Sequence, residues 1–274
     1  MPTQAVSGRA PIAILTDFGY RDHYVGVIKG VIASIAPGAP IVDITHGIPP
    51  QSIAAGALML KQSWRYFPRG TIFMAVVDPG VGTKRLPIAV ETRSGVLLVG
   101  PDNGLLAPAA EDAGLRRAVE LRSPRYRLKE VSATFHGRDI FAPAAAWLWR
   151  GVRLDALGPA IEGIEPSEIA EPARRGRELR GAIVYVDHFG NLVSNIDRRA
   201  FAAFAASFPG KRLWVRLKHS APIELMNAYG DAARGTPLAI FGSFELLEIA
   251  ARDTSAAKRF GARQGSAIAV CAGR

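Results

Sequence analysis

The chain has 274 residues, of which 49% are hydrophobic and 21% are charged, and its formal net charge is +10. This composition excludes a disordered chain, and the length is enough for one large domain or two ordinary ones. The single cysteine, Cys271, excludes an intramolecular disulfide, and no apolar run is long enough to span a bilayer.

The first part of the chain alternates predicted strands and helices. Short apolar runs rich in β-branched residues predict strands at 11–15, 41–44, 71–77, 88–92 and 96–99. Apolar residues at helical spacing predict helices at 22–35, 52–67, 104–113 and 139–149. Alternating strands and helices indicate an open α/β sandwich domain, which we assign to residues 1–157.

The pattern changes after residue 157. Residues 158–180 are rich in Pro, Glu and Arg and show little periodicity, which predicts a linker. The remainder, 181–274, contains predicted strands at 182–186, 213–217, 238–241, 246–250 and 267–270, with a short helix at 201–208. This second part is expected to form a smaller β-barrel domain.

An aspartate follows each of four apolar runs: Asp17, Asp78, Asp102 and Asp187. Ligands of open α/β sheets bind beyond the carboxyl ends of the strands, so the first three carboxylates are expected on one edge. There a carboxylate can bind ribose hydroxyls, hold an ammonium or sulfonium group, or orient a water. Ordinary turn chemistry explains Asp78 and Asp102 as well, and helix capping explains Asp17.

Further polar residues stand near these strand ends. The glycine-rich stretch 78–82 lacks the Gly-Lys-Ser/Thr ending of a phosphate loop, but Lys84 and Arg85 follow it, where a cation can fold back on Asp78. His136 precedes a predicted helix, whose dipole favours a neutral imidazole. The amide of Asn191 can pair with a donor and an acceptor of adenine. His and Asp residues do not have metal-ligand spacing, so no metal is expected.

The net charge allows a nucleic-acid-binding protein as an alternative. The basic residues are scattered, and their densest group, Arg174, Arg175, Arg177 and Arg180, falls in the predicted linker without interleaved aromatic residues. A basic solvated surface is therefore favoured over a nucleic-acid interface.

Several motifs occur together in a characteristic order: Leu-Thr-Asp-Phe-Gly at 15–19, Val-Asp-Ile-Thr-His at 42–46, Val-Asp-Pro-Gly-Val-Gly at 77–82, Gly-Pro-Asp-Asn-Gly at 100–104, Thr-Phe-His-Gly-Arg-Asp at 134–139 and Val-Asp-His-Phe-Gly-Asn-Leu-Val-Ser-Asn-Ile at 186–196. In these motifs the sequence resembles the S-adenosylmethionine hydroxide adenosyltransferases, relatives of the fluorinating and chlorinating adenosyl halogenases. The motifs lie in both predicted domains.

The resemblance implies hydrolysis of S-adenosylmethionine (SAM) to adenosine and L-methionine. It implies a catalytic triad of Asp78, Arg85 and His136, which the halogenases lack. It also implies substrate contacts: Asp17 with the ribose hydroxyls, Asp22 and Asp187 near the methionine amino group, Asn191 with adenine, and later contacts by Ser243 and Glu248. Phe244 stands where the halogenases carry an arginine, so no role is transferred to it.

The resemblance further implies a homotrimer with active sites at subunit interfaces and SAM as substrate, without a cofactor. No signal-peptide pattern is found, so a cytoplasmic enzyme with no membrane or nucleic-acid partner is expected. An adenosyl halogenase and a non-catalytic adenosine or SAM sensor are the rival functions.

Overall fold

The computed structural model describes residues 10–273 and divides into two compact units, Met1–Glu168 and Ile169–Arg274. Each unit is described by itself. The first nine residues, on which the signal-peptide expectation depends in part, lie outside the described residues. No helix within 10–273 has the length and apolar character needed to cross a membrane.

A seven-stranded sheet forms the centre of the first unit, in the order β2-β1-β3-β5-β4-β6-β7. The neighbours β2, β1, β3 and β5 are parallel, whereas β4, β6 and β7 complete the sheet with antiparallel pairs. The strands are β1 (Ile12–Thr16), β2 (Ile41–Thr45), β3 (Ile72–Val76), β4 (Pro87–Thr92), β5 (Leu97–Pro101), β6 (Leu115–Glu120) and β7 (Ala160–Ile161). The predicted α/β class is confirmed.

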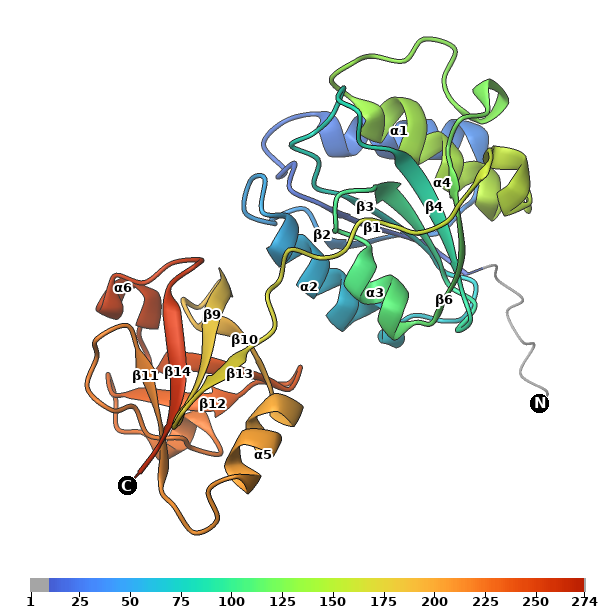
Figure 1. Cartoon of the computed structure of the whole chain (residues 1–274). Helices are drawn as coiled ribbons and strands as arrows, with labels where there is room; N and C mark the ends of the chain where they lie inside the picture. The colour runs from blue at the N-terminus through green and yellow to red at the C-terminus, as the bar shows by residue number, and fades with distance from the viewer. Residues whose placement is uncertain (1–9, 274) are drawn as a thin grey trace, which may run out of the picture. The chain divides into compact units, whose positions relative to one another are not determined.

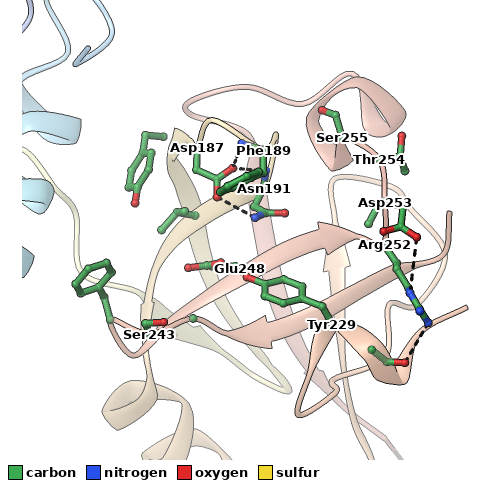
Figure 2. Close-up of a pocket in the computed structure, with 16 residues that line it drawn as sticks. Asp187, Phe189, Asn191, Tyr229, Ser243, Glu248, Arg252, Asp253, Thr254 and Ser255 are labelled. Atoms are coloured by element: carbon green, nitrogen blue, oxygen red, sulfur yellow. Dashed lines mark hydrogen bonds and ion pairs between the residues drawn. The ribbon is translucent and has the colours of Figure 1, made fainter. Parts of the chain in front are cut away.

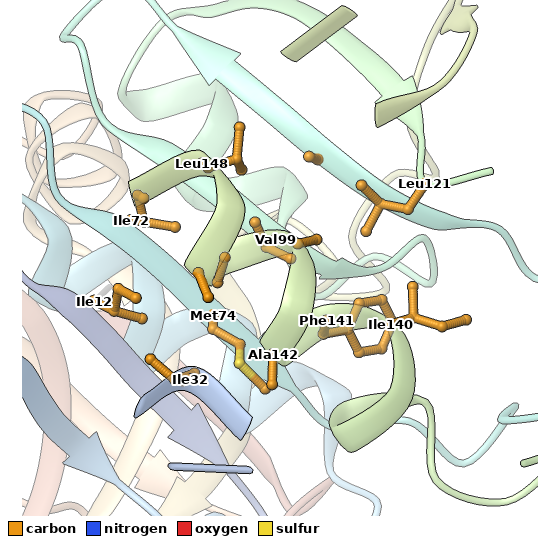
Figure 3. Close-up of a cluster of buried hydrophobic side chains, with 14 of the residues drawn as sticks. Ile12, Ile32, Ile72, Met74, Val99, Leu121, Ile140, Phe141, Ala142 and Leu148 are labelled. Carbon is orange, nitrogen blue, oxygen red and sulfur yellow. The ribbon is translucent and has the colours of Figure 1, made fainter. Parts of the chain in front are cut away.

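Helices cover both faces of this sheet (Figure 1). They are α1 (Tyr24–Ile35), α2 (Ile53–Ser63), α3 (Ala107–Asp112) and α4 (Ala142–Trp149). Helices α1 and α4 pack on each other, as do α2 and α3. Every residue of β1 and β3 is buried, as expected for central strands with helices on both sides. Figure 3 shows the core between the sheet and the α1–α4 pair, where Ile12 and Met74 meet Ile32 and Ala142.

The second unit is an antiparallel sheet with the order β11-β14-β9-β10-β13-β12, and β8 pairs with β9 outside this path. Its strands are β8 (Ala173–Arg175), β9 (Glu178–Val186), β10 (Leu192–Asp197), β11 (Leu213–Leu217), β12 (Pro237–Phe241), β13 (Leu246–Ala251) and β14 (Ala267–Ala272). Single bridges from Val215 to Ile223 and from Leu225 to Ala239 link the two outer strands, so the sheet nearly closes into a barrel. Helices α5 (Arg198–Ala206) and α6 (Ala256–Phe260) accompany it. The predicted β-barrel is thereby confirmed.

Several elements differ from the sequence-based expectation. Strands β6 and β10 were not predicted, and the range 158–180 contains β7 and β8. The helix expected to reach residue 67 ends at Ser63 and continues as a 3-10 turn. Single 3-10 turns cover Trp64–Tyr66, Pro124–Tyr126, Leu154–Leu157 and Tyr229–Asp231, and a π-turn covers Gly137–Phe141.

Candidate active site

Three carboxylates follow neighbouring parallel strands of the first unit. Asp17 comes after β1, Asp78 after β3 and Asp102 after β5, and these strands are adjacent in the sheet. The carboxyl ends of parallel strands lie at one edge, so the expected gathering of the three residues on one edge is confirmed.

Asp78, Arg85 and His136 form a hydrogen-bonded cluster at this edge. The Arg85 guanidinium forms a bidentate pair with the Asp78 carboxylate: Nε donates to Oδ1 at 2.9 Å, and Nη2 donates to Oδ2. The same Nη2 lies 2.8 Å from His136 Nδ1. The Asp78 and Arg85 side chains are only 6% and 8% exposed, and the guanidinium stacks 5.3 Å from the Phe141 ring centre. Arg85 follows Asp78 closely in the sequence, whereas His136 is 51 residues further on, and the fold brings Arg85 into contact with both.

A glycine explains how the Asp78 loop reaches the segment that carries His136. Gly82 has φ +77°, and a Cβ added there would lie 2.4 Å from the carbonyl oxygen of Ala133. Only glycine tolerates both the left-handed backbone and this close approach. The loop therefore packs directly against the segment preceding His136.

His136 immediately precedes a π-turn, Gly137–Phe141, which leads into α4. The Ala142 amide donates to the carbonyl of Gly137, five residues earlier. Pro143 has no amide hydrogen for the carbonyl of Asp139, and the Leu128 amide donates to that carbonyl instead, at 2.9 Å. Local departures of this kind from α-helical pairing are frequent at functional sites.

The protonation state of His136 follows from its partner. Arginine has no acceptor, so Arg85 donates to Nδ1, and a neutral imidazole then carries its hydrogen on Nε2. Burial, and next the positive charge of Arg85, lowers the pKa of His136 below its ordinary value. A neutral imidazole with an Nε2 donor is therefore the form that this cluster favours.

The other carboxylates of the edge make different contacts. Asp17 accepts a hydrogen bond from the Gln51 amide at 2.8 Å, and the α1 N-cap is His23, so Asp17 does not cap that helix. Asp102 accepts from the Glu165 amide at 2.8 Å, and burial raises its pKa. Asp22 is exposed in the turn before α1. Asp102 thus holds a neighbouring loop, whereas Asp17 and Asp22 occupy the approach to the edge of the sheet.

A pocket of about 830 Å³ lies in the second unit, and four predicted substrate-binding residues line it (Figure 2). They are Asp187, which follows β9, Asn191 before β10, Ser243 in the turn between β12 and β13, and Glu248 within β13. These four residues, which were selected from the sequence, therefore lie around one cavity.

Asp187 and Asn191 form a compact loop at one wall of the pocket. Asp187 Oδ1 accepts from the amides of Phe189 and Asn191 at 2.9 and 2.8 Å, and Oδ2 accepts from Asn191 Nδ2 at 2.8 Å. This leaves Asn191 its side-chain carbonyl and one amide hydrogen for a ligand. The Asp187 carboxylate thus fixes the orientation of the Asn191 amide.

Glu248 is a buried acid that faces the same pocket. It is 9% exposed, and the Tyr229 hydroxyl donates to its Oε2 at 3.4 Å. Burial, with a contribution from Asp187, raises the pKa of Glu248 to about 7. Burial also raises the pKa of Tyr185 to about 12. The pocket therefore holds an acidic group that titrates near neutrality.

Sequence patterns did not identify the aromatic lining of this pocket. Tyr185, Phe189, Tyr229 and Phe244 all line it, and Phe189 is 75% exposed. Phe189 belongs to the motif at 186–196, but no pattern assigned it or the other three aromatic residues to a pocket, because only the tertiary structure brings them together. Within the part of the chain that the structure describes, no group of three or more His, Cys, Asp or Glu side chains is arranged to hold a metal ion.

Comparisons with known proteins match both units. Residues 12–158 match the family model for the SAM hydroxide adenosyltransferase N-terminal domain, and residues 181–269 match that for the C-terminal domain. An (R)-S-adenosyl-L-methionine hydrolase from Thermus thermophilus is 37% identical, with 94% of this chain and 98% of that one covered. A fluorinase from Actinoplanes is 27% identical, with 96% and 98% covered. A crystal structure of an uncharacterized conserved protein from Thermotoga maritima superposes with a TM-score of 0.86 at 35% identity, covering 95% of this chain and 99% of that one.

Proposed function

This chain belongs to the S-adenosylmethionine hydroxide adenosyltransferase family, and we propose that it hydrolyses SAM to adenosine and L-methionine. The observation that carries the proposal is the Asp78–Arg85–His136 cluster at the carboxyl edge of the sheet. The hydrolase relative is 37% identical, compared with 27% for the fluorinase. This difference favours water over halide as the nucleophile.

The proposed reaction is a displacement at the ribose C5′. A water oxygen forms a bond to C5′ while the C5′–sulfur bond breaks and its electron pair moves to sulfur. Methionine leaves as a neutral thioether, so protonation of the leaving group is not required. The water loses one proton overall, which makes activation of water the main chemical demand on the protein.

We assign this activation to the cluster. Arg85 is a permanent donor that stabilises the oxygen as it becomes hydroxide, and Asp78 accepts the proton or orients the water. The neutral His136 offers its Nε2 hydrogen to the same oxygen. Their mutual hydrogen bonds hold the groups before substrate binds, so little reorganisation accompanies the reaction.

Geometry and desolvation supply the rest of the proposed rate enhancement. The attacking oxygen must lie in line with the C5′–sulfur bond, and fixing that alignment can contribute several kcal/mol. Attraction between a hydroxide-like oxygen and a sulfonium also increases when water is excluded.

The remaining side chains hold the substrate in this proposal. Asp17 binds the ribose hydroxyls, and Asp22 and Asp187 lie near the methionine amino group. The side-chain amide of Asn191 forms hydrogen bonds with adenine. Ser243 and Glu248 make further contacts, supported by their place in the pocket of the second unit.

Hydrolysis is tested by incubating the purified chain with SAM in water enriched in oxygen-18. We expect adenosine and methionine in equal amounts, with the label in the 5′-hydroxyl of adenosine. A 5′-halo product that appears only when halide is added would instead identify a halogenase. Tight adenosine binding without methionine release would identify a sensor.

The preferred sulfur epimer and the cofactor requirement are part of the same proposal. The hydrolase relative is named for the (R) epimer, so we propose that this epimer is also preferred here. We further propose that no metal or other cofactor takes part and that the enzyme acts in the cytoplasm, without a nucleic-acid or membrane partner. Separate kinetics with the two epimers, each with and without a chelator, test the substrate and metal assignments.

We also propose a homotrimer with active sites at the subunit interfaces. Light scattering coupled to size-exclusion chromatography measures the assembly directly. Co-expression of Asp78→Ala and Asn191→Ala chains tests whether two chains share a site. Activity above that of either variant alone supports shared sites, whereas no recovery in mixed trimers contradicts them.

A further inference from the structure

A buried threonine–histidine pair lies next to Asp17. Thr16, the last residue of β1, and His46, which follows β2, are 0% and 1% exposed. Thr16 Oγ1 and His46 Nδ1 are 2.7 Å apart, and the Phe18 amide donates to the same hydroxyl oxygen at 3.2 Å. The hydroxyl oxygen accepts from Phe18, so its hydrogen is available to His46 Nδ1. In that arrangement the imidazole carries its own hydrogen on Nε2.

The other side of the His46 ring is also enclosed. Nε2 lies 3.2 Å from Asp43 Oδ1, without the alignment of a full hydrogen bond. Asp43 Oδ2 accepts from Lys29 Nζ at 2.6 Å and from the Tyr20 hydroxyl at 3.2 Å. The Tyr20 ring meets the imidazole edge to face at 5.1 Å. Contacts on both sides therefore fix the position of the ring.

The segment from His46 to Gln51 is hydrogen-bonded at each of its ends to the loop that carries Asp17. The Gly19 amide donates to the His46 carbonyl at 2.8 Å, beyond the Thr16 contact. The Gln51 amide donates to Asp17 Oδ2 at 2.8 Å, and Gln51 has φ +63°, a left-handed conformation unusual for a residue with a side chain. Backbone strain of this kind persists where the surrounding structure imposes it.

We infer that His46 is a positioning residue, which acts through Thr16 to aim the Asp17 carboxylate at the ribose diol of the substrate. This inference rests on the proposed function. A carboxylate has more acceptor sites than the single bond from Gln51 uses, so Asp17 can still accept from ribose hydroxyls. The imidazole is buried beneath the loop, so it orients Asp17 and does not touch the substrate.

The test compares the affinities of adenosine and 2′,3′-dideoxyadenosine, measured by calorimetry. Wild type is expected to prefer adenosine, and Asp17→Ala to abolish that preference. Thr16→Val and His46→Leu should each weaken adenosine binding about tenfold, as for a misplaced hydrogen bond to a charged group, with dideoxyadenosine affinity nearly unchanged. Thr16→Ser and His46→Asn, which keep a hydroxyl and an acceptor, should restore much of the preference.

Thr71→Val is the matched control. Thr71 is also fully buried, and its hydroxyl donates to the Pro68 carbonyl, at the opposite end of the sheet. It should leave the adenosine preference intact. Equal weakening of both nucleosides by Thr16→Val, or an unchanged preference, would overturn the inference. The comparison of Thr16→Val with Thr16→Ser decides the matter if His46→Leu does not fold.

The failure of this inference differs from the failure of the proposed function. A wild-type protein that hydrolyses SAM but does not distinguish the two nucleosides would refute the role of Asp17 and His46 while the hydrolase stands. A wild-type protein that prefers adenosine but releases no methionine would refute the hydrolase and leave the positioning role in place.

Discussion

Replacement of Arg85 by lysine tests the geometry of the proposed water-activating cluster. Arg85 makes two contacts with Asp78 and one with His136. A lysine has one nitrogen on a flexible stem, so it cannot reproduce a planar fork that binds both groups at once. Hydrogen bonds to charged groups contribute about 1.5–3 kcal/mol each. Loss of two such contacts in the transition state therefore amounts to roughly 3–6 kcal/mol, a decrease in kcat of about 10² to 10⁴.

The assay is the initial rate of methionine release, with adenosine affinity measured on the same samples. We expect kcat to fall while adenosine affinity stays within about threefold, because Arg85 is assigned to the water and not to the nucleoside. Arg138→Lys is the control: Arg138 binds Asp139 through the same two-pronged contact, at 2.5 and 2.9 Å. A kcat within threefold of wild type for Arg85→Lys, or an equal loss in the Arg138 variant, would refute the assigned role of Arg85.

Three further predictions follow from the two sites. Asp78→Ala and His136→Ala should each reduce kcat about a hundredfold or more, because the first removes the proton acceptor and the second a donor to the developing hydroxide, with adenosine binding retained. Wild-type turnover would exclude these residues from catalysis. Glu248→Gln should stabilise the protein above about pH 7, as measured by denaturant unfolding. Folding raises the pKa of Glu248 from 4.5 to about 7. The stability that the protonated Glu248 side chain contributes is therefore complete below pH 4.5 and is lost as the pH rises through 7, a change of about 3 kcal/mol. A variant with the same dependence of stability on pH as wild type would contradict this. Gly82→Ala should lower the unfolding free energy by about 1–3 kcal/mol and impair turnover, because its Cβ meets the Ala133 carbonyl oxygen at a left-handed φ.

The edge of the parallel sheet was predictable because apolar runs mark the strand ends and the alternation of strands with helices indicates parallel strands. Asp17, Asp78 and Asp102 each follow an apolar run, and parallel strands bring such ends together. The contact of Arg85 and His136 was not predictable from spacing alone. It depends on the tight approach at Gly82 and on the π-turn before α4, which are tertiary features.

The unpredicted strands show where the sequence pattern fails. Strand β6 has only Ala118 and Val119 fully buried, with two exposed arginines beside them, so it lacks an apolar run. Strand β10 buries Ser194, whose hydroxyl donates to the Leu247 carbonyl at 2.6 Å. In the sequence, a buried serine whose hydroxyl is hydrogen-bonded cannot be distinguished from a serine in a turn. The raised pKa of Glu248 was equally hidden, because it depends on burial in the folded unit.

The burial of the Asp78–Arg85 pair is itself an argument for function. Removing two charges from water costs several kcal/mol, and their attraction often does no more than offset that cost. A well-packed apolar pair is therefore expected to be as stable, although a single substitution leaves an unpaired buried charge. We predict that Asp78→Leu and Arg85→Met alone each lose about 3–5 kcal/mol of unfolding free energy.

The double variant Asp78→Leu/Arg85→Met separates stability from function. It should recover most of the stability that either single variant loses, measured by denaturant unfolding, because it contains no unpaired charge. It should nevertheless release no methionine from SAM, since both the donor and the acceptor for the water are gone. A double variant no more stable than either single variant would show that the ion pair stabilises the fold more than an apolar pair does. In that case its burial would give no reason to assign it to catalysis.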